Sequence, residues 1–574
     1  MEIKKLENAP KNIEQYFEIA TQYNDQLPDL WNNLKPEERI FAYYMYRASI
    51  PGNQIIAGQT HRDAVEITDL FEKIINNKEK LPNFIPDGFD YKKFLSECEI
   101  YLIYLLANHG QYFLKEFENN KRTPEKLNLI TLTEDNLVLV LEALGINNAK
   151  STISRLRDSI FNSSIEPTLT VEGSIEKSAT NMYGPGFTDS DFEKLQPEEK
   201  SAINAYFEIE NINDKRVSKV TYYKIGGKFS EELSVAHYWL KKALDHSRLY
   251  PEIFDENIPN SLAHMIKFLE TGDEQDFKKF CIEWIKINGG SLKSKIDFNF
   301  GFVEVYQDPK QYRGSFEADI TIKAVDMQSL NKLFPILEDQ LPFPNEFKRQ
   351  NLNEPGAIPN ASVNAKLFGS GDAGPVKFTA AYCLPNYDEI RSQYGSKQIM
   401  YQQGKGLGEL VNPQAQKKLF NIKEHVEWLN QNDPENKLDH DVADVLTTLH
   451  ETVGHASGRS SMHVFVEGDL LDIGGKKYSV GDEIQVTSDN INEFIGGYMS
   501  GLEELRAEII ALYISIYNFD ELSKNNVFKD WPQKISKDKM IERLILHMAE
   551  AGLWRLLSQN DDAKEISQAH ARAN

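Results

Sequence analysis

The sequence predicts an α+β protein built from two or more lobes. Its 574 residues exceed the size at which one hydrophobic core stops growing, so we expect the chain to divide. Apolar residues recur at helical spacing near both ends of the chain, whereas strand-like alternation is concentrated in its middle. Hydrophobic residues make up 41% and charged residues 26% of the sequence, which is typical of globular rather than disordered proteins.

Helices are expected first along the chain. From residue 31 to residue 146, stretches such as RIFAYYMYRASI and KFLSECEIYLIYLLANHGQYFLKEF show helical spacing and are separated by Pro and Asn clusters. Over residues 206–229 the spacing changes to alternation, which predicts a hairpin whose corner is the pair Gly226 and Gly227.

A helix over residues 234–249 and a second hairpin are expected next. The hairpin strands are FGFVEVY (300–306) and FEADITIKAV (316–325), joined by the turn-rich QDPKQYRGS. Residues 354–376 are dense in Gly, Pro and Asn, so we expect a loop that crosses between lobes. Helical spacing returns after Val411 and is interrupted by a short hairpin within KKYSVGDEIQV.

The predicted crossing loop contains a GxGxxG pattern at Gly369, Gly371 and Gly374. A dinucleotide-binding loop needs a helix directly after it, but here Pro375 and a strand-like run follow. We therefore interpret the glycines as loop residues rather than as a cofactor site.

Charge and composition exclude several classes of partner. Lys and Arg number 64 against 87 Asp and Glu, a formal net charge of −23, and we find no basic stripe. Because nucleic-acid binding depends on neutralising phosphates, we expect no nucleic-acid partner. The apolar stretches end before the ~18 to 20 residues needed to cross a bilayer, so we also expect no membrane span.

The cysteines and the start of the chain predict a cytoplasmic protein. Cys98, Cys281 and Cys383 are far apart and odd in number, which disfavours a disulfide framework. The first residues lack the apolar core and cleavage site of a secretory signal. The sequence gives no basis for assigning an oligomeric state.

The segment DHDVADVLTTLHETVGHASGR contains candidate metal-binding and catalytic residues. Val442, Val445, Leu446 and Leu449 fall at i, i+3, i+4 and i+7, so they predict a helix that buries this face, and His450, Glu451 and His455 come at its end. Five steps on a regular helix turn side chains about 140° apart, against about 40° for four steps. Both histidines can therefore share one ion only if the helix is locally distorted.

Gly454 is the residue type that permits an inserted or π-like turn, which would return the second imidazole to the face of the first. Two imidazoles suit zinc, and a catalytic zinc site adds a third protein ligand and a water. The alternative is that the two histidines form ordinary polar contacts at a helix end.

A third ligand is available in EFIGGYMSGLEELRAEIIALYISIY. This segment predicts a helix whose apolar stripe consists of Leu502, Leu505, Ile509, Leu512 and Ile516. Glu504 and Glu508 share another face, and burying them beside the stripe would require a cation or hydrogen bonds. The alternative is a solvated acidic face that pairs outward.

The two segments together resemble the paired HExxGH and EExRAE motifs of the dipeptidyl peptidase III family. HETVGH (450–455) is followed about 50 residues later by EELRAE (503–508). Further similarity extends over nearly the whole chain, in YRASIPGN, NHGQY, GFVEVYQDP, RGSFEA, LPNYDEIRSQYGSK, GHASGR and SQAHAR.

The resemblance implies a role for each matching residue. His450, His455 and Glu504 would be ligands of one Zn²⁺ per chain, and Glu451 would be the general base that acts on zinc-bound water. Two further acids, Glu503 and Glu508, would orient the imidazoles. His570 matches a family histidine that lies near the reacting carbonyl.

The resemblance also implies an anchor for the substrate's α-amine. We align a family acid with Asp297, a nearby tyrosine with Asn299, and two asparagines with Cys383 and Asn386. Three of these positions depart from the family residues, which affects the length of the excised fragment and the rate. The family also continues past AHARAN, so we expect this chain to stop short of a stretch that supplies a basic residue toward the substrate's C-terminus.

We therefore expect two lobes separated by a cleft. Residues 1–329 and 360–403 would form a lobe of helices with a small β-core, and residues 330–359 and 404–574 a mainly helical, zinc-bearing catalytic lobe. The predicted activity is a zinc metallo-exopeptidase that releases dipeptides from the N-terminus of oligopeptides. Alternatives are a non-catalytic zinc-containing scaffold that binds peptides, and a zinc hydrolase that cuts peptides at a different length.

Overall fold

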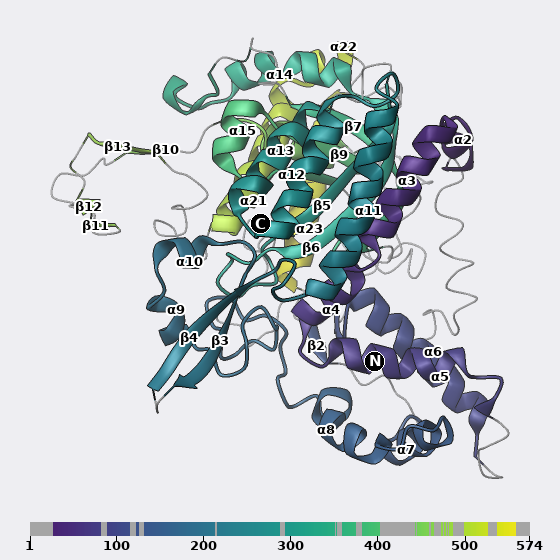
Figure 1. Ribbon diagram of the computed structural model, residues 1–574. Coiled ribbons are helices and arrows are strands. Elements are labelled where there is room, and N and C mark those ends of the chain that lie inside the picture. Colours follow the sequence, from purple (N-terminus) through teal and green to yellow (C-terminus); the bar gives the residue numbers. More distant parts are fainter. Residues whose placement is uncertain are drawn as a thin grey trace.

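The fold is known from a computed structural model. It describes residues 27–81, 89–114, 122–124, 131–212, 215–287, 293–350, 352, 359–374, 381–401, 442, 445–458, 461–463, 472–473, 476–477, 479, 481–485, 499–525 and 537–557. Within these residues, helices surround one five-stranded sheet, and four two-stranded ribbons complete the strands (Figure 1). This confirms the predicted α+β class.

The first described helices account for the expected helical region. They are α2 (Leu27–Asn32), α3 (Pro36–Ser49), α4 (Gly52–Thr60), α5 (Ala64–Asn76), α6 (Tyr91–Asn108), α7 (Glu134–Ala143) and α8 (Ala149–Phe161). The short strands β1 (Tyr112–Leu114) and β2 (Arg122–Pro124) pair between α6 and α7. Helices α5 to α8 enclose their own apolar core, to which Phe71, Phe94 and Leu156 contribute.

The first predicted hairpin forms, but its corner is not the glycine pair. Strand β3 (Ala205–Ile212) pairs with β4 (Lys215–Tyr222) after the short helices α9 (Asp189–Glu193) and α10 (Pro197–Ser201). The chain therefore turns between Ile212 and Lys215. Gly226 has a φ of 78° and lies in the turn before α11 (Ser230–Leu249). Glycine is favoured there because a side chain rarely tolerates that backbone conformation.

A five-stranded sheet forms the centre of the molecule. Its strand order is β5 (Ile296–Glu304), β6 (Ser315–Asp326), β7 (Asn360–Gly371), β9 (Lys397–Tyr401) and β8 (Ala381–Leu384). All neighbours are antiparallel except β7 and β9. The predicted second hairpin is β5 and β6.

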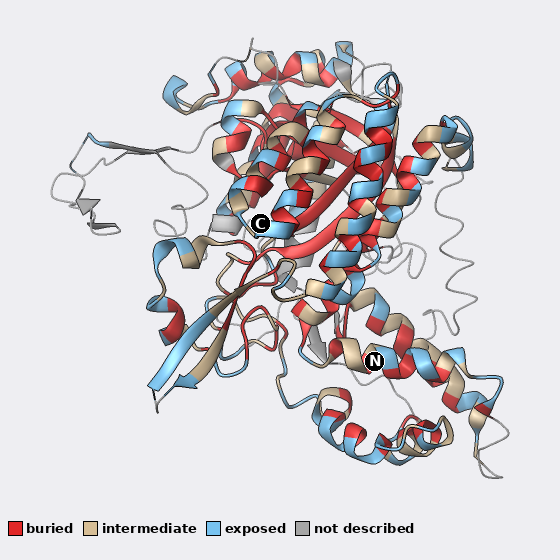
Figure 2. Cartoon of the chain, viewed as in Figure 1, coloured by how far each residue is buried: buried red, intermediate tan, exposed pale blue. Residues whose placement is uncertain are grey.

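Helices cover one face of this sheet. They are α11, α12 (Asn257–Thr271) and α13 (Glu274–Lys286), which lie across the strands in Figure 1. The alternating residues Phe298, Phe300 and Phe302 of β5 are buried in the same apolar core as residues of these helices. In Figure 2 the strands behind these helices are largely red, and the helices carry red bands among exposed blue ones.

The expected crossing loop is largely wrong, because β7 occupies most of residues 354–376. This strand has neighbours on both sides, and its polar side chains bond within the sheet: Asn364 donates from Nδ2 to Thr321 Oγ1 at 2.8 Å. A central strand made of small and polar residues lacks the apolar alternation that predicts strands. Gly371, with a φ of 64°, ends the strand in a turn, so the GxGxxG glycines shape a strand end.

A separate apolar core lies beneath the C-terminal helices. It contains residues of α14 (Gln328–Gln340), of the segment around residues 442–456, and of α21 (Met499–Tyr517), α22 (Phe519–Lys524) and α23 (Lys537–Leu557). Cys383 of β8 also packs in this core. The lobe boundaries at residues 329, 359 and 403 remain a prediction.

Several smaller elements complete the described chain. Helix α15 (Asp388–Tyr394) precedes β9, and η3 (Asn345–Phe347) is a 3₁₀ turn after α14. The ribbons near residue 470 differ from the predicted hairpin within KKYSVGDEIQV. Its two halves pair with different strands: β12 (Lys476–Lys477) with β11 (Asp472–Ile473), and β13 (Glu483–Gln485) with β10 (Ser461–His463).

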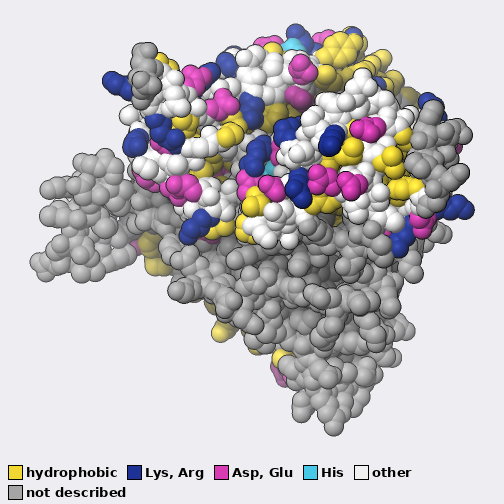
Figure 3. Space-filling model, turned by 90° about the horizontal axis from the view of Figure 1, so that it is seen from below, with side chains coloured by type: hydrophobic (Ala, Val, Ile, Leu, Met, Phe, Trp, Pro, Cys, Tyr) yellow, Lys and Arg dark blue, Asp and Glu magenta, His cyan; other side chains and the backbone are white. Residues whose placement is uncertain are grey.

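Two observations concern possible partners. Among the helices of the described residues, none combines the length and apolar character that crossing a membrane would require. On the face seen in Figure 3, the described Lys and Arg side chains are interspersed with Asp and Glu and form no continuous basic stripe. The expected absence of a nucleic-acid partner remains a prediction.

Candidate metal centre

The helix that carries the two histidines has the predicted distortion. Val442, Val445, Leu446 and Leu449 are all buried, and the next residues form the π-helical turn η4 (His450–Gly454). The backbone N–H of His455 donates to the carbonyl of His450 at 2.9 Å, a bond that spans five residues. The wider turn brings the two rings together, with their centroids 4.6 Å apart and their planes at 89°.

Gly454 has a different role from the expected one. Its φ lies outside the left-handed region, so the turn does not require glycine for its backbone conformation. Instead, a methyl group at this position would lie 2.7 Å from the carbonyl oxygen of Ala507 and 2.8 Å from its Cα. Gly454 is therefore needed because α21 packs directly against the π turn.

Helix α21 presents a different face from the predicted one. Of the expected apolar stripe, Leu502 is 47% and Ile509 57% exposed. The buried face instead carries Ala507, Ile510 and Ile514 together with Glu504, which is only 4% exposed. The helix turns its acid inward because that face packs against the histidines of η4.

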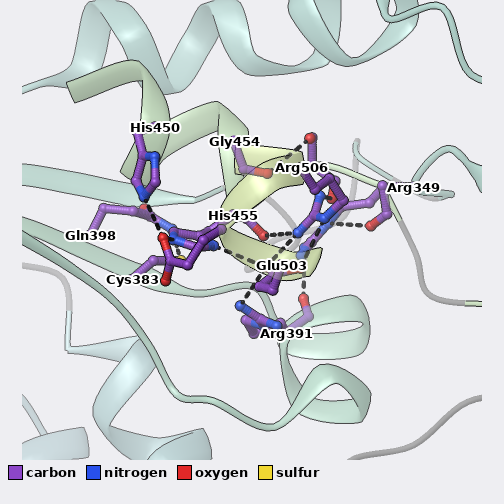
Figure 4. Close-up of polar contacts among 12 residues, drawn as sticks. Arg349, Cys383, Arg391, Gln398, His450, Gly454, His455, Glu503 and Arg506 are labelled. Atoms are coloured by element: carbon purple, nitrogen blue, oxygen red, sulfur yellow. Dashed lines mark hydrogen bonds and ion pairs between the residues drawn. The ribbon is translucent and has the colours of Figure 1, made fainter. Parts of the chain in front are cut away.

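The two histidines, which lie next to each other in Figure 4, converge with Glu504 on one point. One nitrogen of each ring and one carboxylate oxygen lie within 4.8 Å of one another. Glu504 Oε2 is 3.3 Å from His450 Nε2 and 3.8 Å from His455 Nε2. Among the described residues, no other group of three His, Cys, Asp or Glu side chains meets this condition.

This donor set fits a zinc ion. Bonds of about 2.0–2.2 Å at tetrahedral angles place neighbouring ligand atoms roughly 3.4 Å apart, which lies between the two separations given above. Two imidazole nitrogens and one carboxylate oxygen are ligands that zinc favours, and a catalytic site uses three protein ligands.

A carboxylate binds the outer nitrogen of His455, and another lies near the outer nitrogen of His450. His455 Nδ1 is 2.9 Å from Glu503 Oε1, and His450 Nδ1 is 3.9 Å from Glu508 Oε2. With each Nδ1 turned toward a carboxylate, each Nε2 is directed toward Glu504. This arrangement fixes ring orientation and tautomer in metal sites.

The charges around His450 favour a cation. Burial lowers the pKa of His450, but the hydrogen-bonded carboxylate of Glu504 and the charges of Glu451 and Glu508 raise it, to about 9. The carboxylates therefore stabilise positive charge between the two rings, whether protons or a metal ion supply it.

Glu503 is bound from several sides. Arg506 donates to it from Nη2 at 2.6 Å and from Nε at 2.9 Å, and Arg391 Nη1 is 3.6 Å away. Burial raises the pKa of Glu503, but the two guanidinium groups and His455 lower it well below its usual value. Glu503 is therefore a fixed anion that accepts from His455.

The structure describes three of four further predicted site residues, and they differ in burial. Glu451 is buried in η4, and its charge acts on His450 and on the thiol of Cys383. Cys383 is buried, and burial raises its thiol pKa. Asn386 is exposed, and His570 lies outside the described residues.

Asp297 and Asn299 are bound within the sheet. Both carboxylate oxygens of Asp297 are 3.0 Å from Nζ of the buried Lys397. The Asn299 amide donates to Glu317, and its backbone N–H donates to Asp319 at 3.0 Å. These contacts of Asp297 and Asn299 are made within the β-core.

Sequence reasoning missed a tyrosine at the centre. The hydroxyl of Tyr306 donates to Glu504 Oε1 at 3.3 Å, although nearly 200 residues separate them. Tyr306 is 49% exposed as a whole, but its hydroxyl lies against Glu504, and desolvation there together with the charges of Glu304, Glu504 and Glu451 raises its pKa well above the usual value. Both Glu304 and Tyr306 lie in GFVEVYQDP, where a predicted strand ends. This motif is the sequence signal that could have indicated Tyr306.

The chain is similar to known peptidases. The chain is similar to dipeptidyl peptidase 3 of Nematostella vectensis, with 25% identity over 95% of this chain and 76% of that protein. It is also similar to dipeptidyl peptidase 3 of Dictyostelium discoideum, with 22% identity over 84% of this chain and 69% of that protein.

A solved structure and a family model extend the comparison. The fold resembles that of DPP III from Caldithrix abyssi, with a TM-score of 0.54 and 18% identity over 94% of this chain and 79% of that chain. The family model described as peptidase family M49 matches residues 187–574, more than half of the chain, and includes every residue of the metal centre. The chain therefore belongs to peptidase family M49.

Proposed function

We propose that this peptidase is a zinc-dependent exopeptidase that releases dipeptides from the N-terminus of oligopeptides. Its membership of a peptidase family supports hydrolysis of peptides. The observation that carries the zinc proposal is the convergence of His450, His455 and Glu504 within 4.8 Å. The cytoplasmic location expected from the sequence remains a prediction.

Each residue of the centre has a proposed task. His450, His455 and Glu504 would hold the zinc ion. When bound, zinc polarises the scissile carbonyl and lowers the pKa of water toward ~7. Glu451 is the proposed general base: it takes up the proton of the attacking water and passes it to the leaving amine. Its burial and its position between the two metal-ligand histidines in sequence support this role.

Tyr306 is the proposed donor to the reacting carbonyl oxygen. The sequence alignment had given this position to Asn299, whose amide is bound to Glu317. The Tyr306 hydroxyl already lies at the metal ligand Glu504, and its raised pKa keeps it protonated at neutral pH. A neutral hydroxyl donor suits an oxygen that develops negative charge. His570 remains a sequence-based candidate for a similar task.

Glu304 is the proposed anchor for the substrate's α-amine, in place of Asp297. Lys397 neutralises Asp297, whereas the charge of Glu304 acts on the Tyr306 hydroxyl beside the centre. An anchor at a fixed distance from the metal would set the fragment length to two residues. The exposed Asn386 and the thiol of Cys383 remain candidates for contacts with the peptide backbone.

The β-core supplies a proposed track for the peptide. Strand β8 is an edge of the five-stranded sheet, and its Cys383 packs in the same core as residues of η4. A peptide added along an edge strand gains main-chain hydrogen bonds irrespective of its sequence. Such a strand beside η4 would bring its scissile bond toward the metal ligands.

The test is digestion of a peptide of six residues, read by fragment masses. The proposal predicts loss of N-terminal dipeptides, no cleavage after a chelator has removed the metal, and recovery when Zn²⁺ is returned. Glu451→Gln should lower the rate ~100-fold or more and keep the metal. A non-catalytic scaffold would leave the peptide intact. A zinc hydrolase that cuts the peptide at another position would release fragments of other lengths.

A further inference from the structure

A buried network connects helix α14 to the second metal-ligand histidine. Glu338 of α14 is 1% exposed, and its Oε1 accepts from the backbone N–H of Arg349 at 2.8 Å and of Gly458 at 3.0 Å. Its Oε2 accepts from the Gly458 N–H at 3.2 Å. Glu338 thus ties the turn that follows His455 to the chain around Arg349.

The guanidinium of Arg349 joins two segments that are distant in sequence. Arg349 is 8% exposed; it donates from Nε to the carbonyl of Gly458 at 3.2 Å and from Nη1 to the carbonyl of Arg391 at 2.6 Å. Gly458 belongs to the turn after η4, and Arg391 belongs to α15. A rigid, planar donor group can span two such carbonyls at once.

Both segments lead on to His455. From the turn, the carbonyls of Ser457 and His455 accept from Arg506 at 2.8 and 3.1 Å. From α15, the Arg391 guanidinium lies 3.6 Å from Glu503 Oε1, which in turn is 2.9 Å from His455 Nδ1. Figure 4 shows this succession from Arg349 through Arg391 and Glu503 to His455.

The turn itself depends on outside contacts. Gly458 has a φ of 68°, and its carbonyl and N–H are both bound by the Glu338 and Arg349 network. A residue that follows a metal ligand by three positions controls the direction in which the chain leaves that ligand. Removing the guanidinium would remove the hydrogen bond to the Gly458 carbonyl and, at the same time, the hydrogen bond that attaches α15.

We infer that Arg349, seated by Glu338, is a positioning residue that sets the orientation of His455 for metal binding. This inference rests on the proposed function, since it assumes that His455 is a zinc ligand. The network acts on the second histidine, whereas His450 contacts Glu504 and Glu508.

The experiment compares Arg349→Met with Lys348→Met. Both variants remove a positive charge from adjacent residues, but within the described part of the chain the Lys348 ammonium has one hydrogen bond, to the carbonyl of Asp339 at the surface. Zinc affinity is measured by competition with a chromophoric chelator, and ligand geometry by the visible spectrum of Co²⁺ in the same site. Hydrogen exchange of residues 453–458 is measured in the metal-stripped protein.

For Arg349→Met we expect a ~10 to 100-fold weaker zinc affinity, an altered Co²⁺ spectrum and faster exchange of the turn, because supporting residues of metal sites act at this level. Lys348→Met should match the unaltered protein. Arg349→Lys, which can reach only one carbonyl, should fall between them, and it decides the question if Arg349→Met does not fold.

The experiment distinguishes failure of this inference from failure of the proposed function. If a folded Arg349→Met binds zinc as the unaltered protein does, or if Lys348→Met is equally affected, the positioning role is wrong while the proposed function stands. Faster exchange with unchanged affinity and spectrum would assign Arg349 a structural role only and also overturns the inference. If the unaltered protein binds no zinc, the proposed function itself fails, and the inference fails with it.

Discussion

The β-core and the metal centre both bury carboxylates, but they neutralise them differently. In the β-core, Asp297 is matched by the ammonium of Lys397, with both oxygens 3.0 Å from Nζ. In the metal centre, Glu504 faces two imidazoles, with Glu451 and Glu508 close enough to raise the pKa of His450. One acid is paired by a cation of the chain itself, and the other lies among groups that together favour an added cation.

This difference separates structural acids from functional ones. A buried carboxylate matched by a lysine already has its charge compensated and gains nothing from a ligand. Carboxylates gathered around two imidazoles form a site whose negative charge a divalent cation would balance in place of protons. Burial and acidity alone therefore do not identify the site; the identity of the facing group does.

The largest expected effect comes from exchanging the two acids for their amides. Glu504→Gln should weaken zinc affinity at least ~100-fold, because it removes one of three ligands. Asp297→Asn should leave zinc affinity within about twofold, yet cost about 3 kcal/mol of unfolding free energy because Lys397 is left buried without its partner. Chelator competition and urea denaturation measure both quantities. The opposite pattern would reverse the assignment of the two acids.

The next effect compares Tyr306 with Asn299. Tyr306→Phe should lower kcat about 100-fold, since it removes one donor to the reacting oxygen. Zinc affinity should fall by less than this, because the variant also loses one hydrogen bond to Glu504. Asn299→Ala should change kcat less than about threefold and act mainly on stability. Steady-state kinetics on one peptide decides between them. A larger kcat loss in Asn299→Ala would mean that Asn299, not Tyr306, is the donor to the reacting oxygen.

A pH effect is expected within the β-core. Burial raises the pKa of Asp319 to about 6, from its ordinary value of 3.8 in the unfolded chain. Protonation therefore favours the folded state: this contribution is present in full below pH ~4 and is lost as pH rises through ~6. Relative to the unaltered protein, Asp319→Asn should gain about 2 kcal/mol of unfolding free energy between pH 4 and pH 7. A difference that does not change with pH would contradict this titration.

The smallest expected effect concerns the packing of the π turn. Gly454→Ala should cost about 1–3 kcal/mol of unfolding free energy, because the added methyl overlaps the backbone at Ala507. Thr452→Ser, in the same turn, keeps the hydroxyl that donates to the Thr448 carbonyl at 2.6 Å and should cost less. Denaturant unfolding compares them, and equal losses would mean that the close approach of α21 is not what requires glycine.

Much of the metal centre could be predicted because its signals are local. The five-residue spacing of His450 and His455 is incompatible with a regular helix, and η4 is the π turn that this spacing requires. The i, i+4 spacing of Glu504 and Glu508 likewise placed two acids on one face. These predictions use only helix geometry, which does not depend on the rest of the fold.

Other features could not be predicted because they depend on pairing across the chain. The partner of Asp297 is 100 residues away, and that of Tyr306 is 198 residues away. Strand β7 is held by polar bonds to its neighbours rather than by alternating apolar residues. For α21, the Leu and Ile pattern indicated the wrong face, because packing against η4 rather than hydrophobicity decides which side is buried.

The most direct test of the zinc assignment is the X-ray absorption spectrum of the protein at the zinc edge. Ligation by His450, His455 and Glu504 predicts a first shell of nitrogen and oxygen only, at about 2.0–2.2 Å, with the outer-ring scattering of two imidazoles. The buried thiol of Cys383 lies near Glu451 and is the natural competitor. A zinc–sulfur distance of about 2.3 Å, or imidazole scattering that persists in full in His455→Ala, would contradict the account.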